Sequence, residues 1–272
     1  MRPDDISKLL PSGLVAIGKR LTEIGFERTR RAIAALVLSL FVSLYLIGAL
    51  NVPGPLVRVL IALAGCYTVA FLAVVAEWFW GRWFASGLAW SGVMVAIASL
   101  VMMGWTPALA IYGGMHALIV LALGGKKMEA RYDLQEAWRQ RYKMDEFGVA
   151  RLRKTVTRAS ASLPSLIIWA LAPREEGLAL VAAVAALGLA AVGVRGLIRL
   201  RSWSVLSLAA SCALVGLFGH VTAFAFRPVG GDLGGFPALA DFLMTTVPFV
   251  LLAAAVLPFA GPVLHFLRRR AA

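Results

Sequence analysis

The sequence predicts an all-α protein, a polytopic bundle of about eight transmembrane helices with both chain ends on the cytoplasmic side. Hydrophobic residues make up 60% of the 272-residue chain and charged residues only 15%, which is below the quarter that soluble domains carry. The charges are clustered, and the apolar stretches between the clusters are long enough to cross a hydrocarbon core of about 30 Å. Most clusters are basic, and they flank the apolar stretches as cytoplasmic loops do.

The charge distribution supports the number of spans. With the N-terminus inside, alternating spans leave only Arg58, Arg174 and Arg227 of the 27 lysines and arginines in outer loops. If the fifth and sixth spans were both absent, every later segment would stay on the same side, so a six-span chain is the alternative. The eight predicted spans cover residues 32–50, 56–76, 84–103, 108–123, 160–172, 177–194, 203–226 and 242–266.

The first half is predicted to hold a leader and four spans. Residues 1–31 have apolar residues at helical spacing among charges, which is typical of a cytoplasmic amphipathic helix in the headgroup plane. Residues 32–124 hold the first four spans, which are separated by segments rich in turn residues such as 51–55 and 105–107. Tryptophans at the span ends suit the two membrane interfaces.

Residues 125–160 form the longest polar segment and are predicted to be a basic cytoplasmic linker. We expect one helix over Met128–Tyr142 and a second, short one over Val149–Thr157. The first helix would place apolar and basic side chains on a surface that suits anionic lipid headgroups or a protein partner. The candidate contact residues are Arg131, Trp138, Arg139, Arg141 and Lys143.

Residues 161–272 are predicted to hold the other four spans and a basic C-terminal tail. The fifth span is short, about 20 Å of helix, so we expect it to extend back toward Lys154. On the sixth span, Ala182, Ala186 and Ala190 form a stripe of small residues. Such a stripe favours close packing against another helix, either of the same chain or of a partner.

Ionisable residues are scarce in the predicted spans. The absence of Asp, Glu, Lys and Arg near the span centres argues against a proton-coupled carrier, a cation-coupled carrier and a voltage sensor. His116 in the fourth span and His220 in the seventh are candidate ligands of a haem, although their depths differ by about 9 Å. The interpretation that the sequence favours for His116 is a neutral imidazole hydrogen-bonded to a neighbouring helix. No metal site is predicted, and no cofactor beyond this haem alternative.

A substrate cavity is the other candidate site. Prolines such as Pro248 break the eighth span, and broken helices can line a cavity within a membrane. The candidate cavity is predicted to be lined by Thr245, Thr246 and Pro248 of the eighth span and by Tyr112 and His116 of the fourth.

These features favour a non-enzymatic subunit or scaffold of a larger membrane complex. A transporter or channel for an uncharged or lipid-like substrate is the first alternative, and a redox or lipid-modifying enzyme using His116 or His220 is the second. The net charge of +13 is explained by topology and anionic lipid, so nucleic acid is not an expected partner. Anionic lipid and either protein partners or further copies of the chain are expected. The excess of arginine over lysine is typical of GC-rich bacterial genomes, so we expect the membrane to be a bacterial inner membrane.

Overall fold

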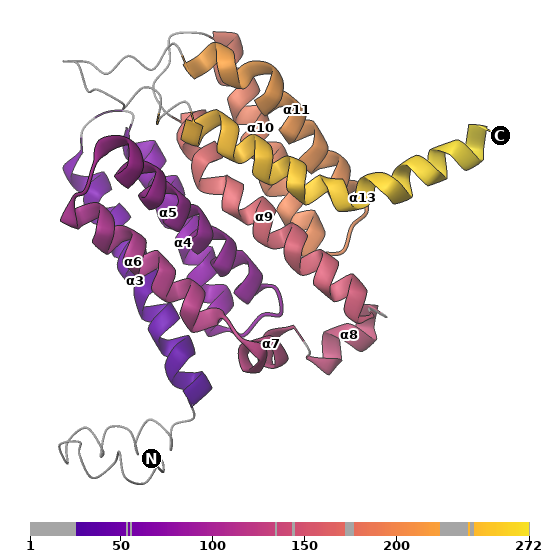
Figure 1. Cartoon of the computed structure of the whole chain (residues 1–272), viewed down its shortest axis with the longest axis horizontal. Coiled ribbons are helices and arrows are strands. Elements are labelled where there is room, and N and C mark those ends of the chain that lie inside the picture. Colours follow the sequence, from indigo (N-terminus) through magenta and orange to yellow (C-terminus); the bar gives the residue numbers. More distant parts are fainter. Residues whose placement is uncertain are drawn as a thin grey trace.

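The computed structural model describes residues 26–52, 54, 56–133, 135–142, 145–171, 177–223, 239 and 242–271, with the backbone alone at 141–142, 220–223 and 260–271. Every element in these ranges is a helix, as predicted (Figure 1). The leader up to residue 25 lies outside them. The elements are α3 (Phe26–Asn51), α4 (Leu56–Val75), α5 (Gly81–Met103), α6 (Pro107–Leu123), α7 (Lys126–Tyr132), α8 (Glu136–Tyr142), α9 (Glu146–Leu171), α10 (Gly177–Ile198), α11 (Trp203–Ala223), the π-helical turn η1 (Phe242–Thr246) and α13 (Val247–Ala271).

Several of these helices could cross a membrane. Within the described ranges five segments are long and apolar enough, namely α3, α4, α5, α10 and Phe242–Phe259. The pair α6 and α7 would give a sixth span, although the two helices are bent by 72° relative to each other. The chain is therefore an all-helical protein of the multi-pass membrane class.

The long helices pack as two halves (Figure 1). In the first, α3 packs on α4 and α6, and α5 packs on α6 and α4. In the second, α10 packs on α11 and α9, and α13 packs on α9 and α11. The main contact between the halves joins α5 to α9. We call the end where α3, α5 and α9 begin and α4, α6 and α10 end the basic end, because Arg30, Arg82, Arg131, Arg153 and Arg195 lie there.

Gly87 lets α5 and α9 approach closely. A Cβ at this position would lie 2.0 Å from the Ser160 hydroxyl oxygen and 2.4 Å from the Thr157 carbonyl oxygen. The buried hydroxyls of α9 bond within their own helix, since Ser160 Oγ donates to Thr157 O and Ser162 Oγ to Ala159 O. Because these hydroxyls are hydrogen-bonded within α9, they need no partner on α5, and the two helices can pack closely although the seam contains polar groups.

The linker differs from its prediction in two respects. The expected helix over Met128–Tyr142 is divided into α7 and α8, because the Asp133 side chain turns into the bundle. The short helix expected over Val149–Thr157 is not separate, since α9 runs without a break from Glu146 to Leu171. Its first turns lie at the basic end and its apolar remainder enters the bundle.

The small-residue stripe of α10 is used inside the chain. Ala182, Ala186 and Ala190 are all buried. Ser211 Oγ of α11 donates to the Ala186 carbonyl at 2.8 Å, and Ser207 Oγ donates to the Leu189 carbonyl at 2.7 Å. Of the two possibilities that the sequence left open, the structure shows packing within the same chain.

Candidate functional site

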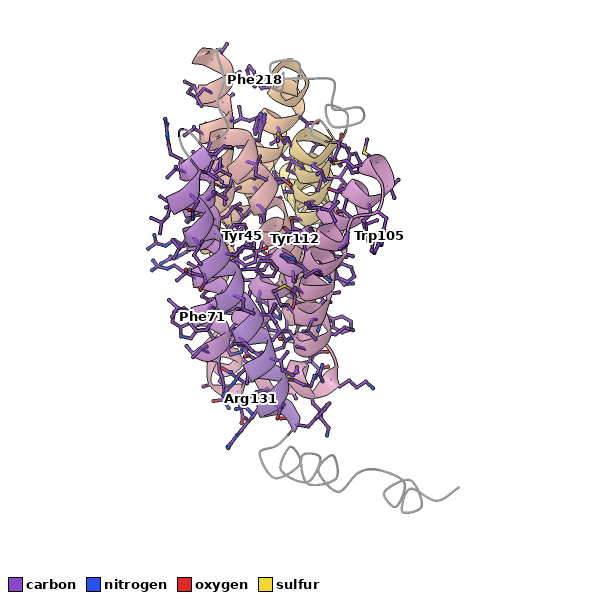
Figure 2. All side chains as sticks on the ribbon, turned by 90° about the vertical axis from the view of Figure 1, so that its left-hand side faces the viewer. Tyr45, Phe71, Trp105, Tyr112, Arg131 and Phe218 are labelled. Atoms are coloured by element: carbon purple, nitrogen blue, oxygen red, sulfur yellow. The ribbon has the colours of Figure 1, made fainter. Side chains whose placement is uncertain are left out.

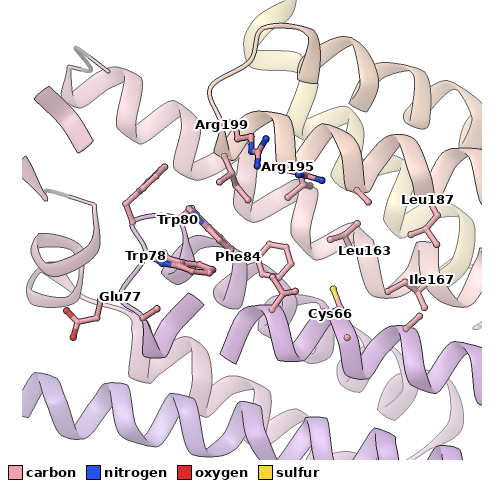
Figure 3. A pocket seen from close by; sticks show the side chains of 18 of the residues that line it. Cys66, Glu77, Trp78, Trp80, Phe84, Leu163, Ile167, Leu187, Arg195 and Arg199 are labelled. Atoms are coloured by element: carbon pink, nitrogen blue, oxygen red, sulfur yellow. The ribbon is translucent and has the colours of Figure 1, made fainter. Parts of the chain in front are cut away.

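A groove of about 950 Å³ lies between the two halves at the basic end (Figure 3). Its walls come from α4, the turn after α4 and the start of α5 on one side, and from α9 and α10 on the other. The walls are largely apolar and include Cys66, Phe84, Leu163, Ile167 and Leu187. Ligand pockets in proteins span about 300–1,000 Å³, so this groove can take a sizeable molecule.

The turn between α4 and α5 shapes the mouth of the groove. Glu77 has a φ of 52°, in the left-handed region that helix C-caps adopt. Its N–H donates to Val74 O at 3.3 Å, and the Trp78 N–H donates to Ala73 O at 3.0 Å, so the turn is a Schellman cap. The cap holds the rings of Trp78 and Trp80 together, with centroids 5.3 Å apart.

The opposite wall of the groove ends in a second Schellman cap, at the C-terminus of α10. Leu200 has a φ of 56°, its N–H donates to Leu197 O at 2.9 Å, and the Arg201 N–H donates to Gly196 O at 2.8 Å. Arg195, in the last turn of α10, and Arg199, in the turn that follows Ile198, line the groove beside this cap. Tightly capped helix ends therefore frame the mouth on both sides.

Arg195 and Arg199 are four residues apart and exposed. Among the described residues, neither has a carboxylate within 4.0 Å. The described lining contains one carboxylate, Glu77, which is paired elsewhere. Arg131 Nε and Nη2 bond its two oxygens at 3.1 and 2.7 Å, and Arg31 also pairs with it. The groove consequently carries an uncompensated positive charge at the basic end.

The linker is fixed beside this mouth by a buried carboxylate. Asp133 is fully buried, and its Oδ1 accepts from Arg82 Nε at 3.0 Å and from Trp83 Nε1 at 2.7 Å. Its Oδ2 also pairs with Arg82 Nη2, and with Arg153 Nη1 at 3.3 Å. Two residues further on, Gln135 donates to the Glu77 carbonyl at 2.9 Å, so the linker is bound to the turn that shapes the groove.

The linker residues predicted to meet lipid or a partner are placed in different ways. Arg131 pairs with Glu77, and Trp138 is buried with its ring stacked on Phe79 at 4.3 Å between centroids. Arg139 is partly buried. The side chain of Arg141 and the whole of Lys143 lie outside the described residues.

His116 bridges helices in the way that the sequence favours. Its Nδ1 lies 2.8 Å from the Tyr112 carbonyl oxygen and its Nε2 lies 2.7 Å from the Tyr67 hydroxyl. Because a carbonyl only accepts, Nδ1 carries the proton and Nε2 accepts from Tyr67. A metal or haem iron at Nε2 would have to displace this hydroxyl. The side chain of His220, the other predicted ligand, lies outside the described residues.

The predicted substrate cavity is only partly assembled. A cavity of about 100 Å³ lies between α3, α4, α5, α6, α9 and η1, and Tyr45, Tyr67 and Tyr112 line it. In Figure 2 the labels of Tyr45 and Tyr112 mark this level of the bundle. His116 is not among the lining residues, but it is hydrogen-bonded to Tyr67, which is. This volume holds roughly three waters at about 30 Å³ each, which is far less than a lipid needs.

The eighth-span members of that predicted set do not line this cavity. Thr245 is buried, and a Cβ at Gly219 of α11 would lie 3.1 Å from its Cβ. Thr246 is exposed and Pro248 is buried. The neighbouring Met244 reaches the cavity instead, from the π-helical turn.

Sequence reasoning missed the groove and the buried ion pair of Arg82 and Asp133. The four-residue spacing of Arg195 and Arg199 was a usable signal, because it puts two guanidinium groups on one helix face. Nothing in the sequence pairs Arg82 with Asp133, which are 51 residues apart.

The fold and these sites define an all-helical, multi-pass membrane protein with an apolar groove between its halves. In comparisons with known proteins, no family model, no curated protein and no solved structure matches the chain.

Proposed function

We propose that the chain is a carrier of a lipid-like amphiphile in a bacterial inner membrane, with eight spans and with its basic end at the cytoplasm. Beyond the segments that pass for spans by length and composition, α9 and α11 support the count of eight. The apolar second part of α9 is buried between α5, α10 and α13, and Trp203–Gly219 of α11 is a shorter apolar helix. Lys126 and Lys127 are exposed at the basic end, which suits a cytoplasmic surface with anionic lipid.

The groove between the two halves is the feature that supports a carrier function. Its lining is mostly apolar and is open to the surroundings of the bundle, since its residues Val69 and Trp78 are exposed. A molecule in the surrounding acyl chains could therefore enter from the side, without passing through water. Many transporters also hold their substrates between two halves of a helical bundle.

A subunit of a larger membrane complex is the second candidate. Phe147 favours it, because this ring is 84% exposed at the start of α9, beside the polar linker. In this second candidate, the Phe147 ring would lie against the partner subunit. The redox alternative requires His116 to give up its bond to Tyr67.

Native mass spectrometry of the protein extracted from its own host in mild detergent separates these proposals. We expect the wild-type chain to retain an added lipid mass. Ala191→Trp places an indole in the groove and should abolish that mass. Ala185→Trp is the matched control, because Ala185 is an exposed alanine of the same helix outside the groove lining.

Each other outcome has a defined meaning. A lipid mass that survives Ala191→Trp places the lipid elsewhere and contradicts the carrier proposal. Added protein subunits without lipid would favour the complex-subunit candidate. Bare chain in every variant would contradict both.

A further inference from the structure

We infer that the amphiphile carries an anionic phosphate-type headgroup, which Arg195 and Arg199 hold at the basic end of the groove. This inference rests on the proposed function and names the substrate class of the same groove. The occupant is one lipid molecule, with its headgroup at the arginines and its acyl chain between the halves.

The arrangement of the two arginines fits a phosphate. On a helix, residues four apart have Cβ atoms about 5–6 Å from each other, so two guanidinium groups can reach one headgroup. Guanidinium forks bind phosphate oxygens through paired hydrogen bonds. A phosphomonoester offers them three free oxygens and a net negative charge, a zwitterionic phosphodiester offers two and no net charge, and a headgroup without phosphate offers none. In Figure 3 both side chains lie over the groove, on the side of Trp80.

No carboxylate of the described groove lining is available to pair with Arg195 and Arg199. Glu77 is already paired with Arg31 and Arg131, and the described lining has no second carboxylate. Gln135 adds a neutral amide to the same end. An anionic headgroup would complete the local charge, whereas a cationic one would be repelled.

The wall below the arginines suits an acyl chain. From Arg199, just beyond the end of α10, the lining continues back along that helix through Val194 to Leu187, twelve residues earlier. That length of helix is about 18 Å at 1.5 Å per residue, comparable with half of a bilayer core. Trp78 and Trp80 at the mouth match the level at which tryptophans meet lipid headgroups. Free phosphate would leave this apolar wall uncovered.

The test uses purified full-length protein, delipidated in a neutral detergent and titrated with single lipids of identical acyl chains. The lipids are phosphatidic acid, phosphatidylcholine and diacylglycerol, and native mass spectrometry gives the dissociation constant of each. Inorganic phosphate is added in a separate arm as a competitor. The variants are Arg195→Gln, Arg199→Gln and the two combined. The control is Arg201→Gln, which removes the same charge as each single variant at an exposed position two residues beyond Arg199 that does not line the groove.

We expect phosphatidic acid to bind at least about tenfold more tightly than phosphatidylcholine or diacylglycerol, because two guanidinium groups would face its net negative charge. The double variant should lose this preference while its affinity for diacylglycerol stays unchanged. Arg201→Gln should keep the preference, and inorganic phosphate should not displace the lipid.

Two results would overturn the inference and leave the proposed function standing. One is equal binding of the three lipids that is still blocked by Ala191→Trp. The other is a preference for phosphatidic acid that survives in the double variant. Displacement by inorganic phosphate would point to a soluble anion and overturn the lipid assignment. If no lipid binds, or if Ala191→Trp changes nothing, the proposed function fails as well.

Discussion

Arg82 of α5 and Asp133 of the linker form a buried ion pair in which both carboxylate oxygens face the guanidinium, with Nε and Oδ1 3.0 Å apart. Asp133 has no exposed surface and Arg82 is 8% exposed. The pair anchors the only linker carboxylate that enters the described core. Loss of the Asp133 carboxylate would leave the buried Arg82 guanidinium without its charged partner.

We therefore expect Asp133→Asn to lower the free energy of unfolding by about 3 kcal/mol, as removal of one partner from a buried pair does. Unfolding in mixed micelles followed by tryptophan fluorescence measures this. Glu136→Gln is the matched control, since Glu136 is exposed in the same linker, and its change should stay within about 0.5 kcal/mol. Equal effects in the two variants would show that the Arg82 contact contributes no special stability.

Gly92 sets the position of the His116 ring. A Cβ at Gly92 would lie 2.1–2.4 Å from three ring atoms, so Gly92→Ala must shift the imidazole, and we expect the shift to weaken its hydrogen bond to Tyr67. We expect a loss of about 1–3 kcal/mol from overpacking. Gly114→Ala is the control, because a Cβ there meets no atom within 4 Å and should be neutral or slightly stabilising. A neutral Gly92→Ala would mean that the ring can move without losing its hydrogen bonds.

Tyr132 gives the fold a dependence on alkaline pH. Burial raises the pKa of Tyr132 from 10 to about 12, and its hydroxyl donates to Val74 O at 2.8 Å. The folded state favours the protonated phenol, so this contribution to stability is complete below pH 10 and is lost as the pH rises to about 12.

The difference in thermal stability between wild type and Tyr132→Phe, measured in detergent across this range, isolates the effect. We expect the wild type to lose stability faster than Tyr132→Phe between pH 10 and about 12. Parallel curves for the two proteins would contradict a buried, protonated Tyr132.

The helical class and the positions of most long helices could be predicted from the sequence, because apolar length and flanking charge are local properties. The limits of α4 and α6 agree with prediction to within about one residue, which is ordinary variation in helix boundaries. The linker could not be predicted in the same way. Its division at Asp133 depends on Arg82 and Trp83, which belong to a distant helix.

The candidate sites show the same division between local and distant information. His116 could be singled out because an imidazole within a span needs a partner, and Tyr67 of α4 supplies it. The groove depends on how α4 and α10 are spaced across the two halves, which no single segment encodes. For the same reason Trp138, which reads as part of an amphipathic face, packs inward on Phe79.

The central claim is that the groove holds an amphiphile, and its most direct test is electron cryomicroscopy of the protein in nanodiscs formed from lipids of its own host. We predict elongated density between α4 and α10, beside Cys66 and Leu187, with a compact feature at Arg195 and Arg199. The Ala191→Trp protein should lack this density. An empty groove, a groove closed by its own side chains, or a groove filled by a helix of another subunit would contradict the account.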